Sequence, residues 1–251
     1  MPAVTLVLFV VFLISLFTWA QYGKHLPDGF GWGVFALFIV FLVLPRVGGR
    51  RSQRGVDLNS EGARLLSHGR IALALEKFEA ARPLLGRGWK AAIAFNIGLC
   101  QMELWRLNAA ELEFSRALDS KRLSKSLQPQ LLPRYALLAA LRGDLQGAAE
   151  RSARALRLNP DSSLLVLMDA VLECRQEEWD QARTLLEDPA HYQLGGPLRG
   201  LRDALLCWCV EHTSGERRYL DRVTVFGEAS TDKLRESWPE LVDFLLQHSP
   251  S

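Results

Sequence analysis

The segment Gly86–Ala92 (GRGWKAA) is the part of the chain whose residue types come nearest to phosphate chemistry, because two glycines precede a lysine. A phosphate-binding P-loop needs the spacing G-x-x-x-x-G-K-[ST] directly after a strand, so that backbone N–H groups and the lysine surround the phosphates. The spacing here differs, and no strand is expected before it. The sequence also lacks G-x-S-x-G, H-E-x-x-H and an EF-hand loop. We therefore expect the protein not to be an enzyme.

Thiol and imidazole groups, the commonest soft metal ligands, show no spacing that suggests a site. The chain has 4 cysteines and 5 histidines. No C-x-x-C occurs, and no Cys/His spacing matches a zinc site. We expect no cofactor and no metal. Cysteines of this kind are usually buried thiols in a reducing compartment, which is our prediction for Cys100, Cys174, Cys207 and Cys209.

The distribution of charge argues against nucleic-acid binding. Residues 55–251 hold 25 Lys and Arg against 27 Asp and Glu, a net charge of −2. A protein that binds nucleic acid needs a basic face that contacts several phosphates. A region that is close to neutral, with its charges interspersed, favours another kind of partner.

Two apolar runs near the N-terminus predict a transmembrane hairpin. Residues 3–20 contain no charge and would form about 27 Å of helix, close to the roughly 30 Å of a bilayer core. The second run, residues 30–45, is shorter and ends at Pro45. Aromatic residues gather around the loop between the runs, as they do at membrane interfaces. A cleaved signal peptide is the alternative, but the start MPAVTL lacks the basic residue that such a signal needs.

The charges beside these runs predict an orientation. The loop between the runs carries Lys24 as its only basic residue other than a histidine. By the positive-inside rule, the arginines after the second run lie in the cytoplasm. We expect a multi-pass protein of the inner membrane, with the hairpin in residues 1–46, a basic linker in 47–54 and the following domain in the cytoplasm. The arginines are Arg46, Arg50, Arg51 and Arg54.

The segment Gly69–Ala81 (GRIALALEKFEAA) carries large apolar and small residues in steps of 3, 4 and 3, which places them on one face of a helix. The same stripe recurs three times, and the first members lie 36, 38 and 34 residues apart. Recurrence near one period indicates a repeated unit. The stripes are Ile71, Ala74, Phe78 and Ala81; Leu107, Ala110, Phe114 and Ala117; Leu145, Ala148, Ser152 and Ala155; and Trp179, Ala182, Leu186 and Pro189.

A second helical run and a short polar turn precede each stripe, so each unit is expected to be a pair of helices. Gly69 and Gly143 lie where the first helix must end and the chain must turn. Gly62 and Gly98 each lie inside a first helix, where glycine is unfavourable by itself. We therefore expect a neighbouring helix to approach closely at both positions.

Residues 55–190 therefore resemble about four units of the tetratricopeptide repeat (TPR) family. That family has a period of about 34 residues, a small residue at position 8, Ala at 20 and 27, and a bulky residue at 24. The aromatic residue usual at position 11 is missing throughout, and Pro160 is the only match at position 32. The resemblance implies antiparallel helix pairs that stack into a solenoid. Position 8 corresponds to Gly62, Gly98, Ala136 and Ala170.

In TPR proteins the first helices of the pairs line a concave groove that holds a peptide or helix of a partner protein. The resemblance implies an apolar groove here, suited either to an amphipathic helix of a partner or to the chain's own C-terminal helix. The lysine–asparagine clamp that some TPR domains use for a partner's carboxylate is not reproduced. The groove residues carried over are Asn59, Leu66, Phe95, Leu99, Met102, Leu137, Leu141, Leu167, Val171 and Arg175.

Residues 191–251 are expected to contain additional helices and a solenoid cap. An apolar stripe in Pro197–His212 fits a fifth first helix, and a last helix opening at Pro239 would cover the end of the stack. The predicted fold class is thus all-α, with an N-terminal transmembrane hairpin followed by a TPR-like α-solenoid and a C-terminal capping helix.

The function expected from these features is that of a bacterial, membrane-tethered TPR scaffold that binds partner proteins at the cytoplasmic face of the inner membrane. The resemblance in layout to known TPR proteins suggests envelope biogenesis or complex assembly as its role. The alternative is a structural or accessory subunit of a larger integral membrane complex.

Overall fold

The computed structural model describes residues 14, 17, 52–120, 123–189, 194–215 and 233–248. The chain divides into two compact units, Met1–Asp57 and Leu58–Ser251. The described part of the second unit is built from helices and turns, and it holds no strand. A helix that ends at residue 67 comes first. The helices after it are α3 (Ile71–Ala81), α4 (Lys90–Glu103), α5 (Leu107–Leu118), α6 (Gln128–Leu141), α7 (Leu145–Leu156), α8 (Ser163–Arg175), α9 (Trp179–Leu186), α10 (Gly196–Ser214) and α12 (Pro239–His248), with a short 3-10 helix, η2 (Arg87–Trp89), before α4.

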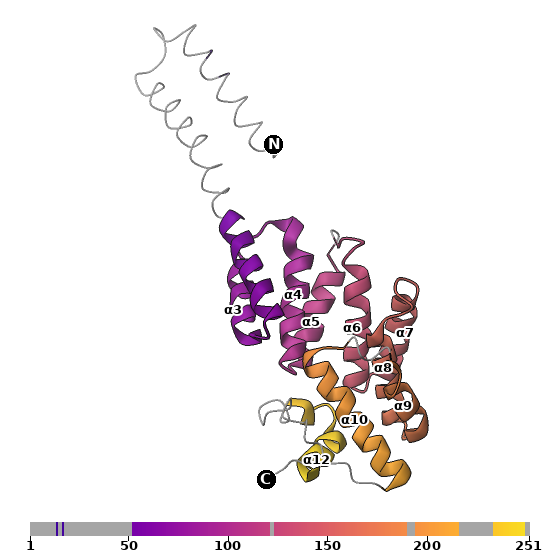
Figure 1. Ribbon diagram of the computed structural model, residues 1–251. Helices are drawn as coiled ribbons and strands as arrows, with labels where there is room; N and C mark the ends of the chain where they lie inside the picture. Colours follow the sequence, from indigo (N-terminus) through magenta and orange to yellow (C-terminus); the bar gives the residue numbers. More distant parts are fainter. Residues whose placement is uncertain are drawn as a thin grey trace. The chain divides into compact units, whose positions relative to one another are not determined.

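The helices form the pairs that the repeat pattern predicts. The four stripes begin at the first residues of α3, α5, α7 and α9, so the second helix of each unit starts where the sequence placed it. In Figure 1, α4 and α5 run antiparallel, as do α6 and α7, and α8 and α9. Each pair also contacts the next, because α5 packs on α6 and α6 on α8. The predicted all-α, TPR-like stacking is therefore confirmed.

Bulky side chains of the second helices pack against small residues of the first helices. A Cβ atom added to Gly98 would lie 2.5 Å from the Phe114 ring, and one added to Gly62 would lie 2.8 Å from the Phe78 ring. Real Cβ atoms do not approach other atoms so closely, so only glycine leaves room for these rings. The close approach expected at both glycines is confirmed. The repeated alanines at positions 20 and 27 are fully buried: Ala74, Ala81, Ala110, Ala117, Ala148, Ala155 and Ala182.

The fourth unit departs from the pattern at its end. Pro189, which takes the place of the last alanine, is exposed, and α9 ends three residues earlier at Leu186. Ser152, which takes the bulky position in the third unit, is only half-buried. A small polar side chain there leaves α7 with fewer large buried residues than α3 or α5.

A left-handed residue lies in the turn of every unit. Gly69, Trp105, Gly143 and Glu177 have φ values of +72°, +56°, +79° and +62°. These residues are 36, 38 and 34 positions apart, the same spacings that separate the stripes. The backbone turn is therefore repeated even where the sequence has no glycine. For residues with a Cβ atom, this conformation costs roughly 1–2 kcal/mol.

Substitutions at the turns are expected to have opposite effects on stability. Glu177→Gly relieves the strained backbone and should raise the free energy of unfolding by about 0.5–1 kcal/mol. Gly69→Ala introduces that strain where nothing lies within 4 Å of the added methyl group, and should lower the free energy by about 1 kcal/mol. Urea unfolding of both variants measures the difference. A destabilised Glu177→Gly variant would contradict the repeated turn.

Helices α10 and α12 follow the last pair and pack on each other. The apolar stripe expected in α10 is buried at Leu201, Leu205 and Trp208. His212 stacks on the Trp179 ring with 4.1 Å between ring centroids, in keeping with a packed rather than a ligating histidine. The last helix starts at Pro239, as predicted, and three of its residues, Leu241, Val242 and Leu245, are almost fully buried.

The described residues contain no helix that is both long and apolar enough to cross a bilayer. The expected localisation, a multi-pass protein of the inner membrane with its repeat domain in the cytoplasm, is therefore contradicted. Helix α10 has 19 residues, but four charged side chains are distributed along it: Arg199, Arg202, Asp203 and Glu211. The two runs expected to form the hairpin, residues 3–20 and 30–45, lie outside the described residues apart from Ile14 and Phe17.

Candidate partner-binding groove

A groove of about 940 Å³ lies between the first pairs of helices and the start of α10. The end of the first helix, the C-terminal end of α4 and the N-terminal part of α6 form its walls. The turn before α8 and the segment that opens α10 close it. The residues that line it include Leu66, Ser67, Ile71, Leu99, Glu103, Gln130, Arg134, Ser163, Leu194 and Leu198.

Two of the groove residues predicted from the sequence, Leu66 and Leu99, line this groove. Both are half-buried, so part of each side chain is available to a ligand. Asn59 is also half-buried, and its Oδ1 accepts a hydrogen bond of 3.1 Å from Nδ2 of Asn96. Asn59 thus ties the first helix to α4 and does not line the groove.

The other predicted apolar residues are packed inside the chain. The first helices are apolar on more than one face, because each contacts its own partner helix, the neighbouring pairs and, for α8, also α10. Their role in binding a partner remains an untested prediction, and they offer little surface in this conformation. These residues are Phe95, Met102, Leu137, Leu141, Leu167 and Val171.

Arg175 joins the repeats to the C-terminal segment. Its Nη2 donates hydrogen bonds to the carbonyl oxygens of Leu141, at 2.6 Å, and Ser237, at 2.9 Å. The guanidinium also lies over the Trp238 ring, 4.2 Å from its centroid. Burial lowers the pKa of Arg175, and the nearby Glu240 opposes that shift. The chain's own segment therefore occupies the place beside Arg175 that the sequence left open to a partner.

Glu103 and Arg134 give the groove a pair of opposite charges. Burial raises the pKa of Glu103, and the positive charge of Arg134 partly opposes the shift. Burial likewise lowers the pKa of Arg134, whose Nη1 donates a hydrogen bond of 2.8 Å to the Gln130 carbonyl. Arg134 was not identified from the sequence. The available signal was a single arginine in the otherwise apolar run LLPRYALLAAL.

The raised pKa of Glu103 predicts that stability falls as pH rises above its ordinary value of 4.5. In that range the folded state still holds a proton that the unfolded chain has lost, so raising the pH favours unfolding. Glu103→Gln removes this contribution, so the free energy of unfolding should fall less with rising pH. The variant should gain stability relative to wild type towards about pH 7. Burial also raises the pKa of Asp169, which lowers stability with rising pH in the wild type and in the variant alike. Urea unfolding across pH measures the slopes, and equal slopes would refute the assignment.

Two buried thiols, one on α8 and one on α10, face each other. The Sγ atoms of Cys174 and Cys209 lie 3.5 Å apart, and that hydrogen bond together with burial raises the pKa of Cys174. Burial raises the pKa of Cys100 to about 12. Cys100, Cys174 and Cys209 are buried, and Cys207 is half-buried. Thiols in such surroundings react slowly. Among the described residues, no group of three or more His, Cys, Asp or Glu could hold a metal ion.

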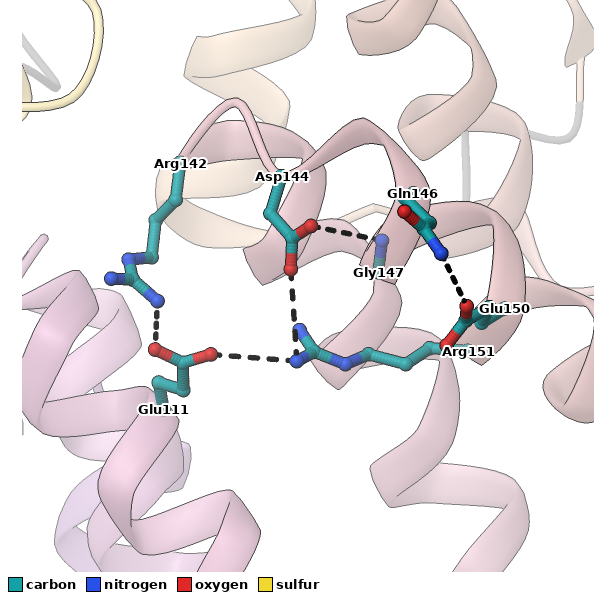
Figure 2. Close-up of polar contacts among 7 residues, drawn as sticks. All are labelled: Glu111, Arg142, Asp144, Gln146, Gly147, Glu150 and Arg151. Carbon is teal, nitrogen blue, oxygen red and sulfur yellow. Dashed lines mark hydrogen bonds and ion pairs between the residues drawn. The ribbon is translucent and has the colours of Figure 1, made fainter.

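A polar network joins the second and third helix pairs, as Figure 2 shows. Glu111 on α5 pairs with Arg142 and, at 3.5 Å, with Arg151 on α7. Asp144 caps α7 by accepting a hydrogen bond of 2.9 Å from the Gly147 N–H. The Arg151 guanidinium also lies 3.9 Å from the centroid of the Tyr135 ring. The contacts of Glu111 with Arg142 and Arg151 span 31 and 40 residues of sequence and fix the second helix pair against the third.

No protein-family model matches the sequence, and no curated protein matches it. Among solved structures, the chain is similar to a tetratricopeptide repeat protein from Parabacteroides merdae, with 14% identity and a TM-score of 0.43. That match covers 79% of this chain and 81% of the other. The description of this chain as a TPR-like helical repeat protein rests on its own helix pairs, their small and bulky residues and their repeated turns.

Proposed function

We propose that this protein is a scaffold that binds a segment of a partner protein in the groove formed by the first helices and the start of α10. The main support for this proposal is the groove itself, whose volume of about 940 Å³ is large enough for several side chains. It is open where Leu66 and Leu99 reach its surface, and these are residues that the TPR resemblance assigned to partner binding.

The lining suits a peptide that has both apolar and charged groups. Leu66, Leu99 and Leu198 offer apolar surface. Glu103 and Arg134 are oppositely charged and lie in surroundings that strengthen hydrogen bonds to a ligand. Repeat proteins use extended concave surfaces of this kind for binding. We therefore propose a binding role and not a catalytic one.

The test uses groove variants that leave the core alone. Ser67 and Gln130 are exposed side chains at the groove wall, so Ser67→Arg with Gln130→Arg should obstruct the groove without unfolding the domain. Gln146→Arg with Gln181→Arg adds the same charge at exposed positions outside it. Peptides are first selected for binding to the full chain from a displayed random library.

We expect the selected peptides to bind the groove variant at least about tenfold more weakly than wild type, since buried contacts of one or two residues are worth more than 1.4 kcal/mol. The control variant should bind like wild type. If every selected peptide binds both variants equally well, the groove is not the recognition site.

A further inference from the structure

We propose that a second site, separate from the groove, binds an acidic segment of a partner protein. The site is a pocket of about 840 Å³ beside the N-terminal end of α4. Helix η2, the residues that follow α3 and the C-terminal half of α5 form its walls. It shares no lining residue with the groove, which lies at the other end of α4.

Four basic side chains line this pocket, against two acidic ones. The cations are Arg82, Arg87, Lys90 and Arg116, and the acids are Glu113 and Asp119. The local balance is therefore +4 −2 = +2, whereas residues 55–251 together carry −2. A concave surface whose charge opposes that of its surroundings attracts ligands of the other sign.

One acid of the pocket is already engaged in fixing two of the cations. The Glu113 side chain is 9% exposed, and its Oε2 lies 2.7 Å from Nη2 of Arg82. Its Oε1 lies 2.5 Å from Nη1 of Arg116. These ion pairs join the end of α3 to α5 and hold both guanidinium groups at the pocket wall, where each remains substantially exposed.

The other two cations have no such acid. Arg87 and Lys90 are exposed, and no ion pair to either is found among the described residues. They come from the GRGWKAA segment, whose spacing excluded a P-loop. The structure shows what that segment does provide, namely two unneutralised cations beside two guanidinium groups that are already held in position.

The apolar part of the pocket selects the class of ligand. Leu85, Ile93 and Ala94 line it together with the cations. A peptide that alternates carboxylates with apolar side chains can satisfy both kinds of surface at once. A nucleic acid strand offers phosphates on a continuous line, and the near-neutral charge of residues 55–251 does not supply a track for them. The occupant to which we commit is therefore an acidic, partly apolar protein segment.

The test measures fluorescence anisotropy of a short labelled peptide in which glutamate and leucine alternate, with the full-length chain at about 50 mM salt, where charge pairs are weakly screened. A peptide with glutamine in place of glutamate is the ligand control. Arg87→Glu with Lys90→Glu is the test variant. Arg154→Glu with Arg157→Glu makes the same change in net charge at exposed positions elsewhere, and thermal unfolding checks that both variants fold.

We expect the acidic peptide to bind wild type and the control variant alike, and to bind the test variant roughly tenfold more weakly. The glutamine peptide should bind wild type roughly tenfold more weakly as well. The proposal is overturned if wild type does not bind the acidic peptide, if either tenfold loss is absent, or if single-stranded DNA of equal charge binds more tightly than the peptide. None of these results bears on the groove, whose residues are unchanged.

Discussion

Phe114→Ala should lower the free energy of unfolding by about 3–5 kcal/mol, the cost of removing a fully buried aromatic side chain from a packed core. The ring lies 6.1 Å from the Phe95 centroid and 6.3 Å from that of Tyr135, so the cavity would open between three helices. Leu112→Ala, two residues away and 51% exposed, should change stability by less than about 0.5 kcal/mol. Chemical unfolding of both variants gives the comparison.

Gly98→Ala tests the same contact from the other side. The added methyl group would meet the Phe114 ring at 2.5 Å, so we expect a loss of about 1–3 kcal/mol from overpacking. In a Phe114→Ala background the ring is gone, and the same change should cost much less. A double-mutant cycle with no coupling between the two positions would show that the ring does not seat on the glycine.

Arg175→Met should lower the free energy of unfolding by about 2–4 kcal/mol and loosen the C-terminal segment first. Methionine keeps part of the apolar stem but loses the hydrogen bonds to Leu141 and Ser237 and the contact with the Trp238 ring. Hydrogen exchange in residues 233–248 should therefore accelerate more than exchange in α4 or α5.

Arg183→Met is the matched control for this variant. Among the residues that the structure describes, Arg183 pairs with Glu187 alone, one turn away on an exposed surface, so its loss should cost less than about 0.5 kcal/mol. If Arg175→Met leaves exchange in residues 233–248 unchanged, the arginine does not hold the C-terminal segment in place.

The repeat could be predicted from the sequence because its signal is local. The stripes at Ile71, Leu107, Leu145 and Trp179 mark the starts of four helices, and the small residues at Gly62 and Gly98 mark where phenylalanine rings must fit. Side chains of this kind recur at a fixed spacing, so one sequence contains several copies of the same packing rule.

The turns show where that local signal fails. Glycine favours the left-handed conformation, so it could be expected at Gly69 and Gly143. Trp105 and Glu177 adopt the same conformation although their side chains disfavour it. The stacking of the pairs on either side fixes the backbone there, and packing outweighs the preference of a single residue.

The site was harder to predict because its geometry depends on contacts between distant segments. A first helix such as α6 is apolar on several faces, so the sequence does not tell which residues face the groove and which face the next pair. Arg175 illustrates the problem, since its partner Ser237 lies 62 residues away. The Cys174–Cys209 contact and the groove charge Arg134 depend on distant segments in the same way.

The most direct test of the proposed binding role is hydrogen exchange of the full-length chain with and without a peptide selected for binding to it. We predict that the bound peptide slows exchange in residues 66–71, 99–103 and 128–134, which belong to the groove walls, and leaves α7 and α9 unchanged. If a selected peptide also binds the Arg87→Glu, Lys90→Glu variant, and so does not use the second pocket, unchanged exchange in all three segments on its binding would contradict the account.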